Sequence, residues 1–517
     1  MGQGKQKSNF FFLLVAGGFT LFALIIAYYK VPIGVEGEWT WDYTQERSWE
    51  RLLGPGVFLA LYLMVVFLGL GRIGRMQRRG RAFAVLLLFI LVFGLQVIAP
   101  YLWEYGAVET LVTMSSPHTT GAYFMESQRV LSIRSYLENF AERISRQWFH
   151  AAPKVNTHPP GSTLLIYATI EFLQAHRGTN AWLNRLFFRI YPHYRVVYEA
   201  GLFALGEATF VGLLLVAFFF CLFGSTALIA AYLLTKEIAG EETAYLAAAF
   251  VGLTPAIMIF SPSPDQILPA LALFYSFFLV KAIRSKSLFY AFCSGLTLFI
   301  WSFFILSFPV MVALTGICLV IYFFALPGRR ERLKTGFWPT LKIACAAAAG
   351  FLVPNLLLLL LRYNAFRVFW ICLAQNDEFY SHFPRTYGKW VLLALPDLFL
   401  FMGIPAACIF IFGLGRAWGH TLKKRSPEIT SLVLLALMAV LFILTIWGVN
   451  RGETGRLWHF LGAVGLAFGT AAVEKGRLLS RKSLLIALVL MALQLILFRL
   501  FFDVWHSQRI ILAGNFG

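Results

Sequence analysis

Thirteen apolar runs, each of roughly the length that a helix needs to cross a bilayer, follow one another along the chain. Polar loops separate them, and the longest loop, 101–201, stands between the third and fourth runs. This pattern predicts an all-α polytopic membrane protein with about 13 transmembrane helices. The runs are 10–29, 53–71, 82–99, 202–234, 244–260, 267–280, 288–306, 308–326, 341–361, 390–414, 429–447, 457–473 and 484–502.

The charged residues of the short loops predict the orientation. Cytoplasmic loops collect Lys and Arg, and five basic loops fall on one side if the N-terminus is cytoplasmic. The loop 236–242 mixes both signs and favours neither orientation. The first run follows Lys5 and Lys7, has no small-residue cleavage site and is interpreted as a retained signal anchor. The basic residues are Arg72, Arg75, Arg78, Arg79 and Arg81; Lys281, Arg284 and Lys286; Arg329, Arg330, Arg332 and Lys334; Arg416, Lys423, Lys424 and Arg425; and Lys475, Arg477, Arg481 and Lys482.

With this orientation the loop 101–201 and the C-terminus lie outside. The run 162–173 is too short to span a bilayer, so we expect a juxtamembrane or re-entrant helix that begins after Pro159 and Pro160. Residues 127–148 alternate apolar and charged positions as an amphipathic surface helix does. The chain is then divided into residues 1–81, 82–361 and 362–517, the last with outer loops 362–389 and 448–456.

Composition supports the membrane assignment. Of the 517 residues, 59 % are hydrophobic and 13 % charged, and the mean hydropathy is +0.72. Soluble domains have about 45–50 % apolar and about 25 % charged residues. The net charge of +19 suits cytoplasmic loops better than nucleic-acid binding, because no soluble segment carries a basic stripe with aromatic residues. The six cysteines stand singly and indicate neither disulfides nor a metal site.

Three motifs in the outer loops place polar groups at span ends, where they are costly unless they serve a function. His158 precedes two prolines that fix its backbone, although the prolines also suit an ordinary helix start. Asp265 ends the segment Ser-Pro-Ser-Pro-Asp between two spans and alternatively caps the next helix. The loop 450–459 holds Arg451, Glu453 and Arg456, which suit a phosphate or form a surface salt bridge.

Several outer acids are candidates for a general base. They are Glu36, Glu38 and Asp42 in the first outer loop, and Glu104 and Glu109 after the third span. Most acids in such loops are solvated charges, so we expect at most one of them to take part in chemistry.

These motifs, in their order, resemble the GT-C superfamily of polyprenyl-phosphate-sugar-dependent glycosyltransferases, which includes aminoarabinose transferase and protein O-mannosyltransferases. The resemblance covers roughly residues 82–260, where a Pro-Pro segment follows a long outer loop. The stretches 260–266, Phe-Ser-Pro-Ser-Pro-Asp-Gln, and 451–458, with Arg-Gly-Glu and a following Arg and Trp, are similar to segments of bacterial members. One position departs from the family. Its catalytic loop begins with an Asp, whereas the corresponding stretch here, 116–123, contains no acid and ends in Tyr123.

The resemblance implies an enzyme of the plasma (inner) membrane whose site faces the outside or periplasm. It would move a hexosyl or pentosyl group from a polyprenyl-phosphate donor to a lipid, glycan or protein acceptor, with inversion. A carboxylate would take the acceptor proton, and the other site residues would bind the substrates. No cofactor is predicted; a divalent metal stays an option because some relatives use one. The expected catalytic residues are Asp265, Glu109, Glu104 and Glu38, and the expected substrate-binding residues are His158, Arg451, Glu453, Arg456 and Tyr123.

Other classes stay open. A transporter or lipid flippase would carry ionisable residues at mid-membrane and paired broken helices, whereas the charges here stand mostly in loops and at span ends. An O-antigen ligase or polymerase would use a diphosphate-linked donor, and a structural membrane subunit would have no site at all.

Overall fold

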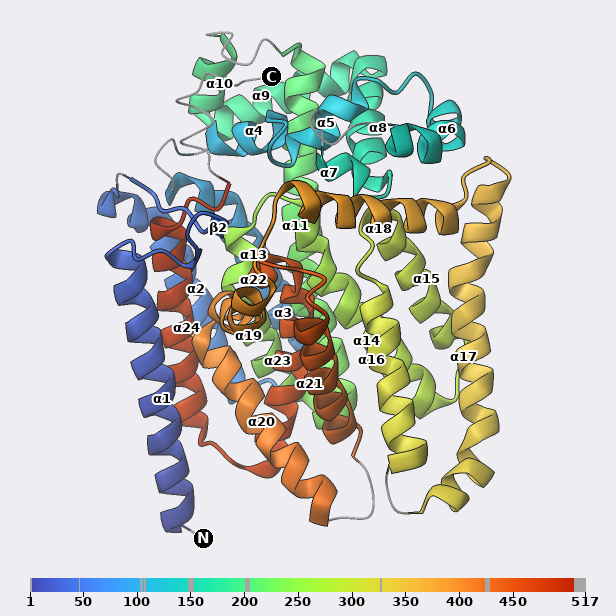
Figure 1. Cartoon of the computed structure of the whole chain (residues 1–517). Helices are drawn as coiled ribbons and strands as arrows, with labels where there is room; N and C mark the ends of the chain where they lie inside the picture. Colours follow the sequence, from blue (N-terminus) through green and yellow to red (C-terminus); the bar gives the residue numbers. More distant parts are fainter. Residues whose placement is uncertain are drawn as a thin grey trace.

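The chain is helical apart from one small sheet and one isolated bridge, over residues 2–45, 47–102, 106, 108–146, 153–199, 205–325, 328–423 and 428–505, which the computed structural model describes. The sheet pairs β1 (Gly34–Val35) antiparallel with β2 (Trp39–Thr40), with Gly34 opposite Thr40. Long helices form a bundle, and a layer of short helices covers one end of it (Figure 1). The predicted all-α membrane architecture is therefore confirmed.

The upper end of the bundle, as drawn in Figure 1, carries α4–α10, and the N-terminus lies at the lower end. The bundle helices are α1 (Gly2–Tyr28), α2 (Leu53–Leu70), α3 (Arg78–Ile98), α11 (Glu207–Ala239), α12 (Glu241–Gly252), α13 (Pro255–Ile259), α14 (Ile267–Ser285), α15 (Leu288–Phe304), α16 (Pro309–Val320), α17 (Arg329–Leu359), α19 (Tyr387–Met402), α20 (Ile404–Lys423), α21 (Ile429–Trp447), α23 (His459–Gly476) and α24 (Arg481–Phe501).

The helices at the upper end are α4 (Val108–Ser115), α5 (Gly121–Ser127), α6 (Ile133–Arg146), α7 (Pro153–Asn156), α8 (Gly161–Ala175), α9 (Arg177–Ile190), α10 (Pro192–Glu199), α18 (Ala365–His382) and α22 (Thr454–Leu457). Four single-turn segments complete the structure: η1 (Trp49–Leu52), η2 (Ala99–Leu102), η3 (Pro264–Gln266) and the π-helical η4 (Ile321–Ala325).

In the described part of the chain, eight helices are long and apolar enough to cross a membrane, and a ninth span is counted if the bent pair α19 and α20 is one. The eight are α1, α2, α3, α11, α14, α17, α21 and α24. The other apolar runs of the sequence form helices that are shorter, broken or less apolar: α12 with α13, α15, α16, α19 with α20, and α23.

The run 390–414 is broken where α19 meets α20 at an angle of 112°. Gly403 adopts a φ of +95° at the break, a backbone conformation that favours glycine. Gln494 of α24 binds both sides, because its Nε2 donates to Leu400 O (2.9 Å) and its Oε1 accepts from the Ile404 amide (2.9 Å). These bonds satisfy backbone groups that a continuous helix would have paired internally.

Ion pairs join the basic loops at the lower end. Arg81 pairs with Glu241 (2.5 Å), Lys281 with Glu237 (2.6 Å) and Lys475 with Glu428 (2.8 Å). The amide of Ser480 also donates to Asn9 of α1 at 2.7 Å. The loops that follow α2, α14 and α23 therefore lie at the same end of the bundle as the N-terminus.

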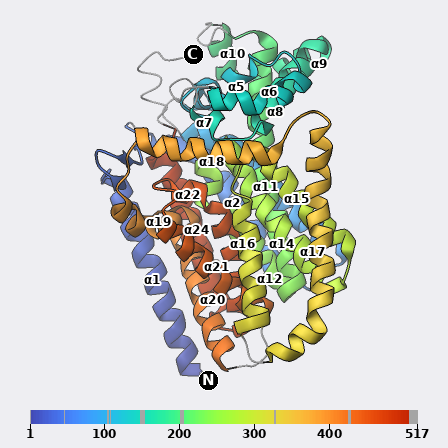
Figure 2. The same cartoon turned by 45° about the vertical axis from the view of Figure 1, so that its right-hand side comes forward.

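The region at the upper end of the bundle, which the sequence predicts to lie outside, contains more helix than the sequence pattern predicts. The amphipathic stretch forms α6, which buries Tyr136, Leu137, Phe140 and Ile144, and the short run forms α8 within the upper layer. The loop 362–389 holds α18, which runs across the spans beneath that layer (Figure 2). One end of α18 is tied to α6 by the pair Arg362–Glu138 (2.5 Å), and Tyr380 near its other end accepts from the Arg451 amide (3.0 Å).

Candidate functional site

The segment 260–266 forms a buried, firmly held turn at the upper end of the bundle. Gln266 Nε2 donates to Gln96 Oε1 (2.8 Å) and to Ile257 O (2.6 Å). The carbonyl of Ser261 accepts from Trp505 Nε1 (3.3 Å), and the Ser261–Pro262 peptide is cis. With its backbone bonded on several sides, the turn presents the side chain of Asp265 in a fixed position.

Asp265 lies in η3, is 7 % exposed and faces Arg456, whose Nε is 3.7 Å from Asp265 Oδ2. Its side chain caps no helix, because the residue before α14 is Gln266, and that position has no side-chain cap. Among the described residues, no group donates a hydrogen bond to its carboxylate. This carboxylate is therefore available to accept a hydrogen bond from a ligand.

The loop 450–459 positions Arg456 between two acids. Arg456 Nη2 lies 2.7 Å from Glu453 Oε2, so the salt bridge that the sequence suggested is present. It is not a surface pair, since both side chains are about four-fifths covered. Arg385 adds a second cation, because its Nη2 lies 3.7 Å from Glu453 Oε1. Arg385, Glu453, Arg456 and Asp265 form a chain of alternating charge, which we name the ionic cluster.

Asp397 of α19 holds this loop from below. Its carboxylate accepts from the Gly455 amide (2.8 Å), the Thr454 hydroxyl (3.0 Å) and the indole of Trp41 (2.7 Å). Asp397 is buried, so the three donors replace the water that its charge would otherwise bind. The backbone around Arg456 is thereby fixed to α19 and to the loop between α1 and α2.

His158 lies in the segment that joins α7 to α8, and its electrostatic neighbours include Asp265 and Arg456 of the cluster. Its Nδ1 lies 2.7 Å from Lys154 O and therefore carries the proton, which leaves Nε2 as an acceptor. Burial lowers the pKa of His158 to about 4, while Asp265 acts in the opposite direction. The imidazole is thus neutral at pH 7. Tyr123 of α5 lies edge-on to it with ring centroids 5.7 Å apart.

Gly161, which follows the two prolines, allows the start of α8 to lie close to the end of α15. A Cβ at Gly161 would overlap the carbonyl oxygen of Phe303, at the end of α15. Glycine therefore lets the start of α8 pack directly on α15, and this contact sets the position of His158 three residues earlier.

Lys154 supplies a further cation, and its electrostatic neighbours are Arg456, Glu453 and Asp265. Burial and, to a smaller extent, the nearby guanidinium of Arg456 lower the pKa of Lys154 to about 8, against the opposite effect of Glu453 and Asp265. Its Nζ lies 5.3 Å from the ring centre of Trp505, and the guanidinium carbon of Arg456 lies 5.9 Å from the same ring. Both cations therefore border one indole.

The structure thus gathers five of the predicted residues, namely Asp265, His158, Glu453, Arg456 and Tyr123. Sequence reasoning missed Lys154, Trp505, Arg385 and Asp397. Lys154 stands four residues, about one helical turn, before His158, so this spacing could have predicted that it lies near the site. The other three come from distant segments, and nothing in the sequence links them to the motifs.

Glu38 is engaged elsewhere. Its carboxylate accepts from the amide of Thr386 (2.8 Å), from the hydroxyl of that residue (2.5 Å) and from Trp390 Nε1 (2.8 Å). The Thr386 hydroxyl in particular lowers the pKa of Glu38 to about 2. In this position the carboxylate fastens the loop between α1 and α2 to the start of α19.

The remaining predicted residues lie apart from the Asp265 carboxylate or outside the described residues. Arg451 donates to the carbonyls of Gly448 (3.3 Å) and Arg385 (3.2 Å), which directs its guanidinium to backbone groups. Glu109 of α4 is 2 % exposed and interacts electrostatically with the buried Arg499. Glu104 lies outside the described residues. Among those residues, no group of three or more His, Cys, Asp or Glu side chains is arranged to hold a metal ion.

In comparisons with known proteins, no family model matches the chain and no curated protein sequence matches it.

Proposed function

We propose that the chain is a GT-C-type glycosyltransferase that moves a sugar from a polyprenyl-phosphate donor to an acceptor on the outer face of the plasma (inner) membrane. The proposal includes thirteen spans, a cytoplasmic N-terminus and an upper end that faces the outside or periplasm. The observation that carries it is the Asp265 carboxylate, which accepts no hydrogen bond from the described residues, pairs with Arg456 and is an electrostatic neighbour of His158.

The cations suit a phosphate. A donor of this kind carries an anionic phosphate next to the bond that breaks, and its lipid chain stays in the bilayer. Arg456 offers a planar fork of donors and Lys154 a point charge, a combination that matches phosphate oxygens. We assign the phosphate to these two residues in place of the pair Arg451 and Arg456, because Arg451 is bonded to carbonyls.

Asp265 is assigned the role of general base. As the acceptor oxygen forms its bond to the anomeric carbon, its proton passes to Asp265, and the bond from that carbon to the phosphate oxygen breaks. The phosphate leaves with the electron pair and needs no strong acid. Neutral His158, whose Nε2 accepts, and Tyr123, whose hydroxyl donates, are assigned to hydrogen bonds with sugar hydroxyls. Inversion at the anomeric carbon rests on the family resemblance alone.

The proposal is tested in proteoliposomes that contain a polyprenyl-phosphate sugar labelled in the sugar and a membrane extract as the source of acceptor. A transferase converts the donor to free polyprenyl phosphate and moves the label to a new product. A flippase instead moves intact donor between leaflets, and a ligase consumes only the diphosphate-linked donor. Intact donor after prolonged incubation with active extract would contradict the proposal.

The assigned role of Lys154 predicts a pH dependence. Lys154 is protonated below its pKa of about 8, so kcat/KM for the donor is expected to fall as pH rises through that value. Because the ordinary value is 10.5, the unfolded chain holds this proton more tightly, and folding stability gains as pH rises between about 8 and 10.5. The pH profile of kcat/KM is measured for the wild type and for Lys154→Arg.

The arginine variant keeps its charge throughout this range and is expected to lose the descending limb near pH 8. A descending limb that persists unchanged in Lys154→Arg would assign it to another group and remove Lys154 from the phosphate site.

A further inference from the structure

Four exposed arginines stand in the short segment 71–79 that joins α2 to α3, which we name the arginine turn. The candidate spans on its two sides are Trp49–Leu70 and Arg78–Leu102, so the chain leaves one span and enters the next within a few residues. In a bilayer the arginine turn is therefore at the level of the headgroups. Its exposed arginines are Arg72, Arg75, Arg78 and Arg79.

The arginine turn is held by its own backbone and by one apolar side chain. The amides of Arg72 and Ile73 donate to Gly69 O at 2.9 Å and 2.8 Å, and the amide of Arg75 donates to Arg72 O at 2.9 Å. The side chain of Ile73 is fully buried and fastens the turn to the bundle. The guanidinium groups are thus presented from a fixed backbone.

The positive charge of the arginine turn is not balanced by protein. In the part of the chain that the structure describes, none of its four arginines forms an ion pair. The carboxylates beside it already hold other cations, because Glu241 pairs with Arg81 (2.5 Å) and Glu242 pairs with Arg481 while packing against Gly74. The first turn of α3 contains no acid, and the positive end of its dipole adds to the charge. The turn therefore attracts an anion.

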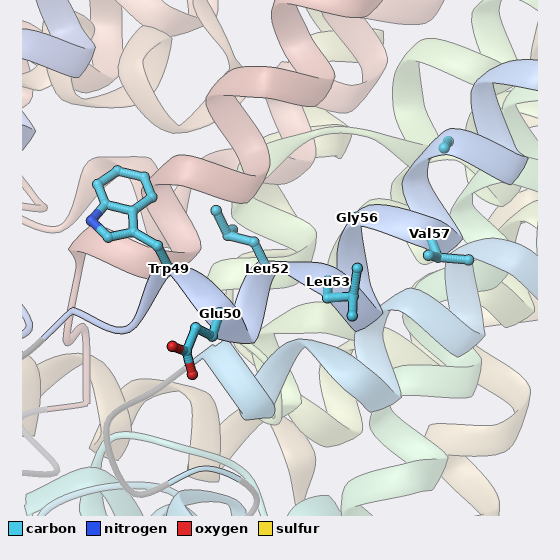
Figure 3. A pocket seen from close by; sticks show the side chains of 7 residues that line it. Trp49, Glu50, Leu52, Leu53, Gly56 and Val57 are labelled. Atoms are coloured by element: carbon cyan, nitrogen blue, oxygen red, sulfur yellow. The ribbon is translucent and has the colours of Figure 1, made fainter.

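One side of α2 is exposed from its start to its end. At the upper end it is hollowed into a groove beside Leu53 and Val57 (Figure 3). The exposed face continues downward through Leu61, Met64 and Leu68, which are 41 %, 47 % and 52 % exposed. Residues three or four apart lie on one face of a helix, so this apolar face leads down to the arginine turn.

The helix on the other side of the turn has a similar face. Arg79, Phe83, Leu86 and Ile90 of α3 follow one another at intervals of three or four residues and lie on one side of it. The three apolar side chains are 66 %, 48 % and 51 % exposed. An exposed apolar track on α3 therefore ends at an arginine of the turn.

The exposed faces of α2 and α3 open to the same side of the helix pair. The line of contact between the helices is marked by Phe58 against Gly94 and by Gly54 against Ile98. Along its own helix, each exposed face lies about a quarter turn before this line, at 3.6 residues per turn. Because the two helices run in opposite directions, equal rotations bring both faces to one side. Two apolar tracks thus meet at one basic turn.

We propose that the arginine turn binds the phosphate of one anionic phospholipid, of the phosphatidylglycerol kind, whose two acyl chains follow the exposed faces of α2 and α3. Guanidinium groups stay charged and donate paired hydrogen bonds to phosphate oxygens. A zwitterionic lipid is disfavoured, because its own ammonium meets the same positive charge. The inference requires only that the chain lies in a bilayer, so it stands or falls independently of the glycosyl transfer.

The test is native mass spectrometry of the full chain released from nanodiscs that contain equal amounts of phosphatidylglycerol and phosphatidylcholine. The wild type is expected to retain one phosphatidylglycerol with a preference of about fivefold or more, the factor that a single arginine contributes beside anionic lipid. The triple variant Arg72→Gln, Arg75→Gln, Arg79→Gln is expected to lose this lipid. The three side chains are exposed, so the variant is expected to fold.

The matched control is the triple variant Arg284→Gln, Arg330→Gln, Lys334→Gln. It removes the same charge from exposed positions at the end of α14 and the start of α17, and it is expected to keep the bound phosphatidylglycerol. If both triple variants lose the lipid to the same extent, the lipid is held by the diffuse positive charge of the lower end and the proposal is overturned.

A second measurement separates a lipid from a free anion. Phosphatidylglycerol added to the protein in detergent is expected to raise the Tm of the wild type and to leave that of the arginine-turn variant unchanged. Glycerol phosphate at the same concentration carries the charge without acyl chains and is expected to raise neither. An equal rise with glycerol phosphate would assign the turn to a free anion and overturn the lipid.

Discussion

Asp265→Asn is expected to lower kcat for transfer by about 10²–10⁴-fold, the contribution that a positioned general base usually makes. The amide keeps the size of the carboxylate but cannot take a proton from the acceptor. The exchange removes no hydrogen bond from a described residue, and Arg456 keeps its closer ion pair with Glu453, so folding is expected to be preserved. The donor KM changes little, because the phosphate is assigned to Lys154 and Arg456. Initial rates at saturating donor in the proteoliposome assay measure the effect.

The matched control is Asp377→Asn in α18, which makes the same chemical change at an exposed position. It is expected to retain full activity and the same thermal stability. If Asp265→Asn were to keep kcat within about threefold of the wild type, the general-base assignment would pass to the neutral His158, the other acceptor in the cluster.

Asp397→Ala is expected to lower the free energy of unfolding by about 3 kcal/mol, because two buried donors lose their acceptor and the Thr454 hydroxyl loses one of its two. The donors belong to Trp41, Thr454 and Gly455, so the change also loosens the attachment to α19 of the loop that carries Arg456, which keeps the bond from the Thr454 hydroxyl to Ala394 O (2.7 Å). Thermal unfolding in detergent measures the loss of stability. Donor KM is expected to rise in the same variant, since Arg456 loses its fixed position.

Asp377→Ala serves as the control, because it removes a carboxylate that is exposed to water. If Asp397→Ala is as stable as this control, the three hydrogen bonds do not contribute to the free energy of unfolding, and the packing of α19 alone accounts for its stability. A rise in KM without loss of stability would restrict the role of Asp397 to placing the loop.

The apolar pattern predicted the helical membrane bundle because hydrophobicity over a bilayer-length window depends only on local composition. It did not predict how the run 390–414 divides. The break needs Gly403 and also Gln494, which comes from a helix ninety residues later and bonds both ends. The number of thirteen spans and their orientation stay predictions, since eight helices of the described residues, or nine spans with the bent pair α19 and α20, satisfy the length and composition of a span.

The candidate site, like the fold, could be predicted from the sequence only where neighbouring residues determine it. Motifs of adjacent residues, such as the one that ends in Asp265, indicated groups that the fold brings together. Whether each of these groups is available to bind a ligand depends on partners that are distant in the sequence. Glu38 matched Asp265 as an outer acid, yet residues 386 and 390 occupy its carboxylate. Nothing in the sequence indicated Trp505, because its part in the site comes from contacts of its ring with Lys154 and Arg456, which are distant in the sequence.

The ionic cluster has a consequence for ionic strength. Mobile ions screen charges that they can approach, and the side chains of Arg385, Glu453, Arg456 and Asp265 are all largely covered. Some of the ion pairs at the lower end are far more open, as in Arg481 with Glu242, where about half of each side chain is exposed. Concentrated salt therefore weakens the attachment between the lower loops first. The arrangement of charge around Asp265 is kept under conditions in which the opposite end of the bundle has already loosened.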